Sequence, residues 1–176
     1  MGDKTLSSFR HIPRKRFGQH WLKDQGVLNQ IVKAAELNPD DCVLEVGPGK
    51  GALTEKLIES QARFIQAIEL DRDLVVGLKK RFSHQSKFSL REGDVLSAPL
   101  EAENGLIINK VVANIPYNIT GPLLKRLIGE LRKAPENSFE TLVLLMQKEV
   151  AQRLVALPGT SSFSALSVRI QLLAKC

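Results

Sequence analysis

A chain of 176 residues with a hydrophobic fraction of 43%, a charged fraction of 25% and a net charge of +6 is expected to form one globular domain and favours a polyanionic partner. No run of about 18 apolar residues occurs, which argues against a membrane span, and the N-terminus lacks the apolar core of a secretory signal. Cys42 and Cys176 are too few and too far apart in sequence for a disulfide framework or a metal site, so we expect a cytoplasmic protein.

The positive charge gathers near the N-terminus, where residues 9–23 carry five basic side chains and no acidic one. A solvated basic tail would explain the charge alone. Aromatic rings inside the same segment favour contact with a partner, because a solvated tail has no need of them. We therefore separate a basic N-terminal arm, residues 1–23, from a folded domain, residues 24–176. The basic residues of the segment are Arg10, Arg14, Lys15, Arg16 and Lys23, and its rings include Phe17, His20 and Trp21.

From residue 24 onward, stretches with apolar residues at helical spacing alternate with short runs rich in β-branched residues. Asp71 can cap a helix, and Thr120 with the Gly-Pro that follows it is a start signal for another. In chain order the predicted elements are a helix at 24–37, strands at 42–46 and 63–70 separated by a helix at 52–60, a helix at 71–82, strands at 87–90 and 110–113, a helix at 120–131, a strand at 141–147, and helices at 148–156 and 164–175.

Strands that alternate with helices predict βαβ units. The expected fold is therefore α/β and Rossmann-like, with a mostly parallel sheet and helices on both faces. Ligands of such folds bind at the carboxyl ends of the strands. The unusual polar residues of this sequence follow predicted strands, so we expect the functional site at that edge of the sheet.

Glycines follow the first predicted strand in the sequence VGPGKG. Gly47, Gly49 and Gly51 allow a turn with positive φ and let a ligand touch the backbone. The helix that follows favours an anionic group at its N-terminus. The pattern Gly47-x-Gly49-x-x-Ala52 also matches the dinucleotide fingerprint, so a nicotinamide oxidoreductase is one alternative and a turn without a ligand is another.

Acidic residues follow the second and third predicted strands. Glu69 lies about 20 residues after the glycines, where a carboxylate can accept hydrogen bonds from both ribose hydroxyls of a nucleoside. That contact is expected for NAD and for S-adenosylmethionine alike, so the presence of Glu69 does not distinguish these two cofactors. Asp94 can accept a hydrogen bond from an adenine amino group. A surface glutamate and a plain Gly-Asp turn are the structural alternatives.

The tetrapeptide Asn114-Ile115-Pro116-Tyr117 follows the fourth predicted strand. An exocyclic adenine amine is a poor nucleophile, and acceptors aimed at its hydrogens favour the pyramidal, nucleophilic form. The Asn114 side-chain oxygen and a neighbouring backbone carbonyl can supply them, Pro116 fixes φ and thus the carbonyl direction, and Tyr117 offers a ring for stacking an extruded base. The tetrapeptide therefore favours methyl transfer to an amine over hydride transfer, with an Asn-x-Pro turn and a core tyrosine as the structural alternative.

Five motifs together closely resemble those of the ribosomal RNA adenine dimethyltransferase family. The resemblance runs from about Arg14 to the C-terminus. It implies S-adenosylmethionine-dependent N6,N6-dimethylation of two adjacent adenosines near the 3′ end of small-subunit rRNA, in the immature small ribosomal subunit. We expect the protein to be a monomer. The motifs are RKRFGQHWL (14–22), EVGPGKGALT (45–54), IELD (68–71), GD (93–94) and NIPYNITGPLL (114–124).

The resemblance also implies roles for individual residues, with a segment before the first helix closing over the cofactor. The implied cofactor contacts are Gln19, His20, Leu22, Gly47, Gly49, Glu69, Asp94 and Asn114. The implied catalytic residues are Asn114, Pro116 and Tyr117, and the implied RNA contacts are Arg14, Lys15 and Arg16.

Two departures from the family pattern stand out. His20 occupies a position where the family most often has Asn, so its contact could depend on pH or involve only the backbone. The family's catalytic domain has seven strands followed by a small helical domain, whereas this chain ends after a helix-like segment. We therefore expect a fragment that lacks the last two strands and the helical domain.

Two relatives of this activity remain as alternatives. An erythromycin-resistance type enzyme resembles the family but modifies large-subunit rRNA, and a non-catalytic RNA-binding factor can share the fold. RKRFGQ and NITGPLL favour the small-subunit type, and the intact NIPY argues against a non-catalytic factor.

The basic arm yields a first prediction. If Arg14, Lys15 and Arg16 contact phosphates, replacing all three with Ala should reduce the salt dependence of RNA binding by about two to three units of slope, because fewer counterions are released. Cofactor affinity should not change. The measurement is RNA affinity across a range of salt concentrations, and an unchanged slope would mean that the arm is a solvated tail.

Overall fold

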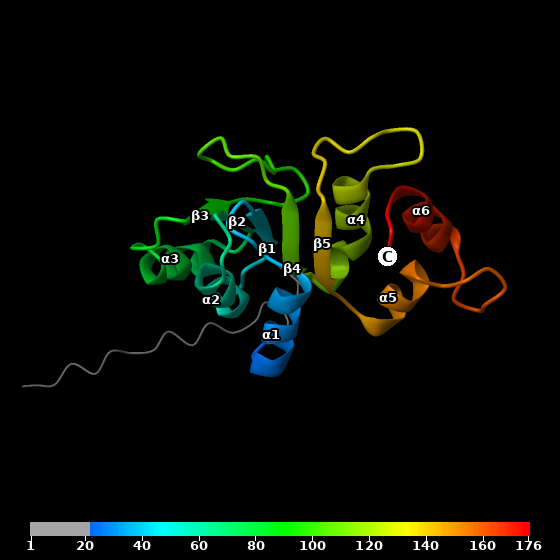
Figure 1. Cartoon of the computed structure of the whole chain (residues 1–176), viewed down its shortest axis with the longest axis horizontal. Helices are drawn as coiled ribbons and strands as arrows, with labels where there is room; N and C mark the ends of the chain where they lie inside the picture. Colours follow the sequence, from blue (N-terminus) through cyan, green and yellow to red (C-terminus); the bar gives the residue numbers. More distant parts are fainter. Residues whose placement is uncertain (1–21) are drawn as a thin grey trace, which may run out of the picture.

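The protein is described by a computed structural model that covers residues 22–176 (Figure 1). Within this range the chain forms a five-stranded sheet with strand order β3-β2-β1-β4-β5, and every neighbouring pair is parallel. The predicted α/β architecture with a parallel sheet is confirmed. The strands are β1 (Cys42–Val46), β2 (Phe64–Glu69), β3 (Phe88–Glu92), β4 (Lys110–Asn114) and β5 (Thr141–Leu145).

Helices cover both faces of the sheet. Apolar residues of α1, α2 and α3 pack on one face, and those of α4 pack on the other. Beyond β5 and α4, helices α5 and α6 pack against each other (Figure 1). No helix in residues 22–176 combines the length and the apolar character needed to cross a bilayer. The helices are α1 (Gln25–Ala34), α2 (Ala52–Glu59), α3 (Arg72–Arg81), α4 (Thr120–Ile128), α5 (Lys148–Leu154) and α6 (Ala165–Leu173).

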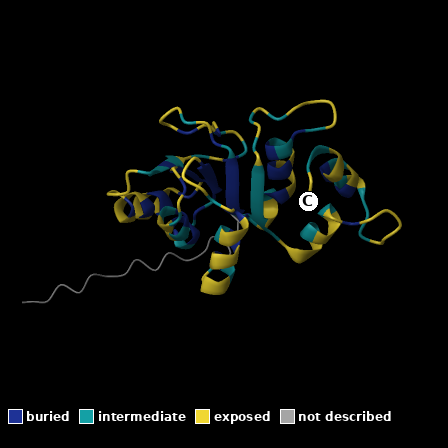
Figure 2. Cartoon of the chain, viewed as in Figure 1, coloured by how far each residue is buried: buried dark blue, intermediate teal, exposed yellow. Residues whose placement is uncertain are grey.

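The three central strands form the core of the domain. Every residue of β1 and β2 is buried, and so are the first four residues of β4. Strand β5 is half-buried along its whole length and, within the described residues, pairs with β4 alone (Figure 2). Within residues 22–176, β5 is therefore an edge strand of the sheet.

Caps and tight turns fix where the helices begin. Asp24 and Asp71 cap α1 and α3, accepting hydrogen bonds from the backbone N–H groups of Val27 and Asp73 at 3.1 Å each. Gly51 precedes α2 with φ of 81°, and a Cβ at this position would lie 2.8 Å from side-chain atoms of α3. Only glycine therefore allows this close approach of the first loop to α3.

Helices α1 and α4 each end three residues earlier than the sequence pattern predicts. Helix α1 ends at Ala34, shortly before Glu36 takes a left-handed backbone conformation with φ of 44°. Helix α4 ends at Ile128, because Gly129 with φ of 86° turns the chain into a loop. Leu131, the last residue of the predicted helix, is consequently exposed.

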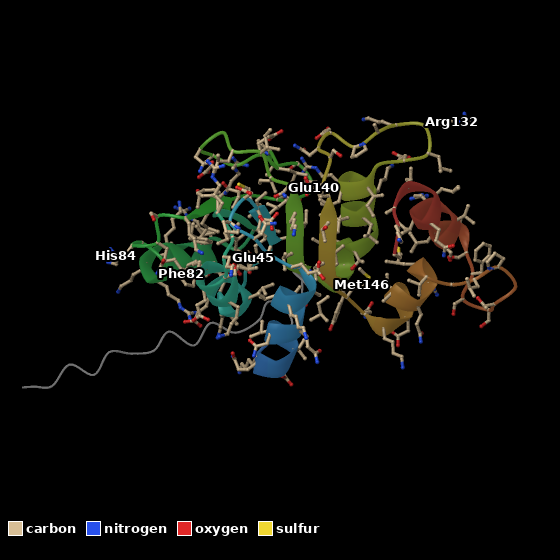
Figure 3. The ribbon with its side chains drawn as sticks, viewed as in Figure 1. Glu45, Phe82, His84, Arg132, Glu140 and Met146 are labelled. Carbon is tan, nitrogen blue, oxygen red and sulfur yellow. The ribbon has the colours of Figure 1, made fainter. Side chains whose placement is uncertain are left out.

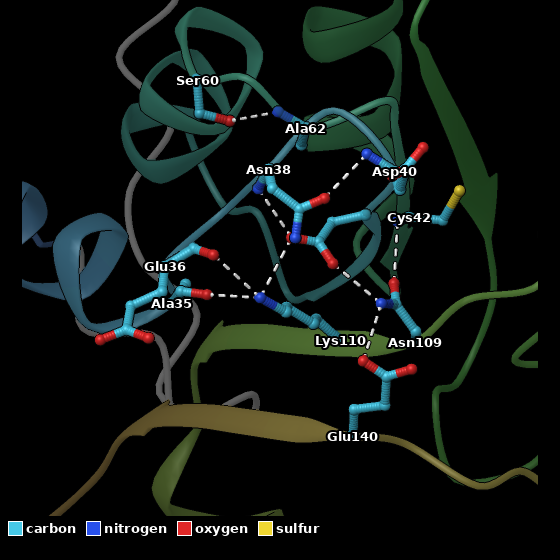
Figure 4. A network of polar contacts seen from close by, with 11 residues as sticks. Ala35, Glu36, Asn38, Asp40, Cys42, Ser60, Ala62, Asn109, Lys110 and Glu140 are labelled. Atoms are coloured by element: carbon cyan, nitrogen blue, oxygen red, sulfur yellow. Dashed lines mark hydrogen bonds and ion pairs between the residues drawn. The ribbon is translucent and has the colours of Figure 1, made fainter.

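A buried ion pair joins β4 to the end of α1 at the amino ends of the strands (Figure 4). Lys110 Nζ lies 3.0 Å from Asp41 Oδ2 and donates to the carbonyls of Ala35 and Glu36 at 3.0 Å each. Asn109 Nδ2 donates to Asp41 Oδ1 at 2.8 Å. Burial by itself raises the pKa of Asp41, but hydrogen bonds from the backbone N–H of Asn38 and from Asn109 and Lys110 outweigh it, so the net pKa is lowered.

This pair yields a stability prediction. Lys110→Met should lower the free energy of unfolding by about 3–5 kcal/mol, because it leaves the Asp41 carboxylate buried without its cation. The double variant Lys110→Met/Asp41→Asn should recover part of the loss, since the unpaired charge is gone. Urea unfolding at pH 7 measures both, and equal losses in the single and double variants would contradict the role assigned to the pair.

Candidate active site

A cavity of about 360 Å³ opens at the carboxyl ends of the strands. The loops after β1, β2, β3 and β4 line it, together with Leu22 ahead of α1. The structure therefore brings together every site residue expected from the sequence that falls within the described range. Gln19, His20 and the basic residues Arg14, Lys15 and Arg16 lie outside that range. The expected residues that line the cavity are Leu22, Gly47, Gly49, Glu69, Asp94, Asn114, Pro116 and Tyr117.

The loop after β1 presents its backbone to the cavity. Gly47 and Gly49 have φ of 65° and 61°, and the N–H of Gly47 donates to the carbonyl of Ile68 at 3.0 Å. A Cβ added at Gly47 would lie 3.8 Å from Pro116 Cδ and Cγ. The loop after β1 is thus held against β2 on one side and borders the loop after β4 on the other.

Glu69 connects the loops that follow three strands. Its Oε2 accepts from the N–H of Gly49 at 3.0 Å, and its Oε1 accepts from the N–H of Asp71 at 2.9 Å. Its backbone carbonyl accepts from the N–H of Gly93 at 2.9 Å. Burial raises the pKa of Glu69, and these backbone hydrogen bonds to the carboxylate only partly oppose it. Each carboxylate oxygen can accept a second hydrogen bond, so both remain able to receive ribose hydroxyls.

Asp94 stands at the exposed rim of the cavity. Its Oδ1 accepts from the N–H of Leu96 at 2.9 Å, and its carbonyl accepts from the N–H groups of Ser97 and Ala98 at 2.9 Å and 2.7 Å. These bonds close a turn over residues 94–98. The turn follows β3, whose parallel pairing with β2 brings Asp94 to the same edge as Glu69.

The segment after β4 leaves the sheet as a short, well-defined turn. Asn114 ends β4, and the N–H of the buried Ile115 donates to the carbonyl of Leu145 at 2.9 Å. Pro116, with φ of −58° and ψ of 133°, leads into a single 3₁₀ turn, Tyr117–Ile119. Tyr117 is 41% exposed, which excludes the alternative of a core tyrosine and leaves its ring accessible to a ligand.

Glu45 is a cavity residue that the sequence interpretation missed. It lies on β1, the central strand of the sheet, with 1% exposure (Figure 3). Neither carboxyl oxygen has a hydrogen-bond partner among residues 22–176. Burial raises its pKa to about 8; the nearby Thr54 hydroxyl opposes this rise and the charge of Glu69 adds to it. The available signal was an acidic residue inside an otherwise apolar strand, two positions before Gly47.

The residues of the cavity fit the cofactor implied by the resemblance. S-adenosylmethionine carries a nucleoside together with sulfonium and ammonium cations. The cavity wall offers a carboxylate for ribose at Glu69, an acceptor for adenine at Asp94, and a buried carboxyl at Glu45 whose oxygens lack partners among the described residues. A buried carboxyl without partners is costly when ionised, so Glu45 holds its proton below about pH 8, and a cationic ligand beside it would favour the ionised form.

Glu45 yields a prediction on pH dependence. Its pKa of about 8 lies above the ordinary value of 4.5, so the folded state retains a proton that the unfolded chain releases between these values. This group therefore lowers the free energy of unfolding as pH rises from 4.5 to 8, by up to about 1.4 kcal/mol per pH unit. Glu45→Gln removes that loss, so the variant should gain stability relative to the wild type as pH rises.

Urea unfolding of the wild type and Glu45→Gln at several pH values across this window is the measurement. The burial of Glu69 contributes in both proteins and cancels in their difference, and the charge of Glu69 is the smallest contribution to the raised pKa of Glu45. A difference in unfolding free energy that stays constant with pH would contradict the assignment.

Comparisons with known proteins agree with this geometry. The family model for ribosomal RNA adenine dimethylase matches residues 10–176. Two relatives carry the description ribosomal RNA small subunit methyltransferase A. The protein of Prochlorococcus marinus strain NATL2A is 92% identical over 99% of this chain and 60% of its own length, and that of Synechococcus sp. strain CC9902 is 69% identical over 97% and 62%. The chain thus spans about 60% of the length of the curated relatives it matches.

Solved structures give the same result for the fold. A dimethyladenosine transferase from Plasmodium falciparum has a TM-score of 0.74 and 34% sequence identity, covering 87% of this chain and 52% of that one. The 23S rRNA methyltransferase ErmE has a TM-score of 0.64 and 32% identity, covering 76% and 50%. These similarities confirm the Rossmann-like methyltransferase fold, and the family match confirms the cofactor class, S-adenosylmethionine rather than a nicotinamide. The chain belongs to the ribosomal RNA adenine dimethylase family.

Proposed function

We propose that this chain forms the cofactor-binding and catalytic part of an enzyme that transfers methyl groups from S-adenosylmethionine to N6 of two adjacent adenosines near the 3′ end of small-subunit rRNA. The observation that carries the proposal is the single cavity in which acceptors for a nucleoside, Glu69 and Asp94, meet the Asn114–Tyr117 segment. The relatives described as small-subunit rRNA methyltransferases support the choice of ribosomal subunit.

The first task of the site is to hold the cofactor. Glu69 is placed to accept the ribose hydroxyls, and Asp94 to accept the adenine amino group. The backbone N–H groups at the start of α2 suit the carboxylate of the methionine portion. Leu22 adds an apolar wall next to the proposed closing segment. When bound, S-adenosylmethionine supplies a methyl group activated by the adjacent positive sulfur.

The second task is to make the target amine nucleophilic. The Asn114 side-chain oxygen and a backbone carbonyl of the same turn accept the two N6 hydrogens, which turns the nitrogen lone pair out of conjugation with the ring. Pro116 fixes the direction of that carbonyl, and the exposed ring of Tyr117 stacks on the extruded base. The proton leaves after transfer, so no strong base is needed. Because a monomethylated N6 still carries one hydrogen, the same acceptors serve the second transfer.

The substrate-binding part of the proposal extends beyond the cavity. The basic arm, residues 1–23, supplies Arg14, Lys15 and Arg16 for phosphate contacts next to the catalytic domain, residues 24–176, and Gln19, His20 and Leu22 close over the cofactor. The partner is the immature small ribosomal subunit, met in the cytoplasm by a monomer. The net charge of +6 supports binding to a polyanion.

Methylation of large-subunit rRNA is the second candidate. The 23S rRNA methyltransferase ErmE shares the fold at 32% identity, so the catalytic geometry alone suits either RNA. The chain is 92% and 69% identical to two proteins described as small-subunit rRNA methyltransferases, which favours methylation of small-subunit rRNA.

The experiment that tests the proposal is methyl transfer from labelled S-adenosylmethionine to immature small ribosomal subunits, with the modified base identified by mass spectrometry. Dimethyladenosine in small-subunit rRNA supports the proposal. Transfer only to large-subunit rRNA would establish the second candidate instead, and tight binding of NAD without methyl transfer would overturn both.

Substitutions in the catalytic turn give the matching prediction. Asn114→Ala should lower the rate of transfer by about 10²–10³-fold while RNA affinity stays near that of the wild type, because the lost contact acts on the reacting amine. Asn137→Ala, in the loop before β5, is the matched control and should retain activity. Tyr117→Phe should be milder than Tyr117→Ala, because stacking needs the ring more than the hydroxyl; equal losses would contradict the stacking role.

A further inference from the structure

Arg126 lies on α4 and contacts the turn that carries Asp94. Its side chain is 16% exposed. The guanidinium donates from Nη1 to the carbonyl of Val95 and from Nη2 to the carbonyl of Ala98, the latter at 2.7 Å. A single planar fork thus holds two carbonyls of one turn, an arrangement that fixes orientation better than a single-point contact.

The turn held by Arg126 is the one that carries Asp94. Bonds from the N–H groups of Leu96, Ser97 and Ala98 to Asp94 close the turn internally, but they do not fix it to the rest of the domain. Its first attachment is the bond from the N–H of Gly93 to the Glu69 carbonyl at 2.9 Å. The guanidinium of Arg126 supplies a second attachment, at the carbonyls of Val95 and Ala98.

Packing of Val95, Leu96 and Ala98 in the apolar core also holds the turn, and the hydrogen bonds of Arg126 add a fixed orientation to that packing. Arg91 donates to the carbonyls of Pro99 and Glu101, which lie after the turn. Glu136 lies 3.6 Å from Arg126 Nη2, but its side chain is 71% exposed and such a pair contributes little. The contact between Arg126 and Val95 is different, because Val95 is buried and lines the cavity beside Asp94.

Arg126 also connects two parts of the site. Helix α4 begins directly after the 3₁₀ turn Tyr117–Ile119. The helix whose Arg126 bonds to the Asp94 turn is therefore continuous with the turn proposed to bind the target base. The sequence separation of 31 residues between Arg126 and Val95 means that the contact joins otherwise separate segments.

We propose that Arg126 is a positioning residue for the adenine pocket. It orients the Asp94 turn so that the Asp94 carboxylate meets the adenine amino group of the ligand, without touching the ligand itself. This inference rests on the proposed function, since it requires an adenosyl cofactor. Arg126 thereby contributes to the preference of the pocket for adenine over other bases.

The expected effect is a loss of discrimination between bases. A hydrogen bond from the adenine amino group to the Asp94 carboxylate should favour S-adenosylhomocysteine over S-inosylhomocysteine, in which a carbonyl replaces that amino group, by roughly 10- to 100-fold. In Arg126→Gln the turn loses its clamp, so this preference should fall to a few-fold at most. Arg126→Lys should recover part of it, because an ammonium can donate to both carbonyls but lacks the planar fork.

The test is calorimetric titration of both ligands into the wild type and the variants, with thermal unfolding of each protein as a folding control. Arg132→Gln, in the loop after α4, is a matched loss of an arginine away from the Asp94 turn, and Glu136→Gln removes the ion-pair partner alone (Figure 3). Both controls should keep the wild-type preference. Should Arg126→Gln unfold, the reduced preference of Arg126→Lys carries the test.

A preference that falls in the Arg126 variants and persists in the controls supports the proposal. A full wild-type preference in a folded Arg126 variant, or an equal weakening of both ligands, would overturn the positioning role and leave the proposed function standing. A wild-type chain that bound neither ligand would instead overturn the adenosyl cofactor, and the positioning role with it.

Discussion

The hydrogen bonds accepted by Glu69 hold together the loops at the carboxyl ends of the strands, and the shape of the cavity depends on them. Parallel strands bring their carboxyl ends to one edge, but the loops that follow them must still be held relative to one another. Glu69 does this with two side-chain oxygens and one backbone carbonyl, which accept from Gly49, Asp71 and Gly93. The group proposed to bind ribose is thus also the group that shapes the pocket, so binding and local order are coupled at one residue.

Buried acidic residues have opposite pKa shifts at the two ends of the strands. At the amino ends, Lys110 and Asp41 form a buried pair whose members are well supplied with hydrogen bonds, and the pKa of Asp41 is lowered. At the carboxyl ends, burial raises the pKa of both Glu45 and Glu69, and the Glu45 oxygens have no partner among the described residues. The stabilising ion pair of Lys110 and Asp41 therefore lies away from the cavity. The two carboxyl groups whose ionised forms burial disfavours, Glu45 and Glu69, lie at the cavity, where a nearby cationic ligand would favour ionisation.

Local patterns were sufficient to predict the elements that position the site. Strand β1 matches its predicted bounds, and the residues expected at the strand ends do gather in one cavity, because a parallel sheet leaves them no other edge. The end of α4 was not predictable from apolar spacing, since Gly129 overrides it. The sequence did not predict that the Glu45 oxygens lack hydrogen-bond partners among the described residues, or that Arg126 donates to the Val95 carbonyl. Both depend on packing between segments far apart in the sequence.

Glu69 is the residue through which the cavity is proposed to hold an adenosyl cofactor. Calorimetric titration of S-adenosylmethionine into the wild type and Glu69→Gln tests it most directly. We expect saturable binding of one ligand per chain, an affinity reduced roughly 10- to 100-fold in the variant, and no measurable binding of NAD. Unchanged affinity in Glu69→Gln, or binding of NAD in preference to S-adenosylmethionine, would contradict it.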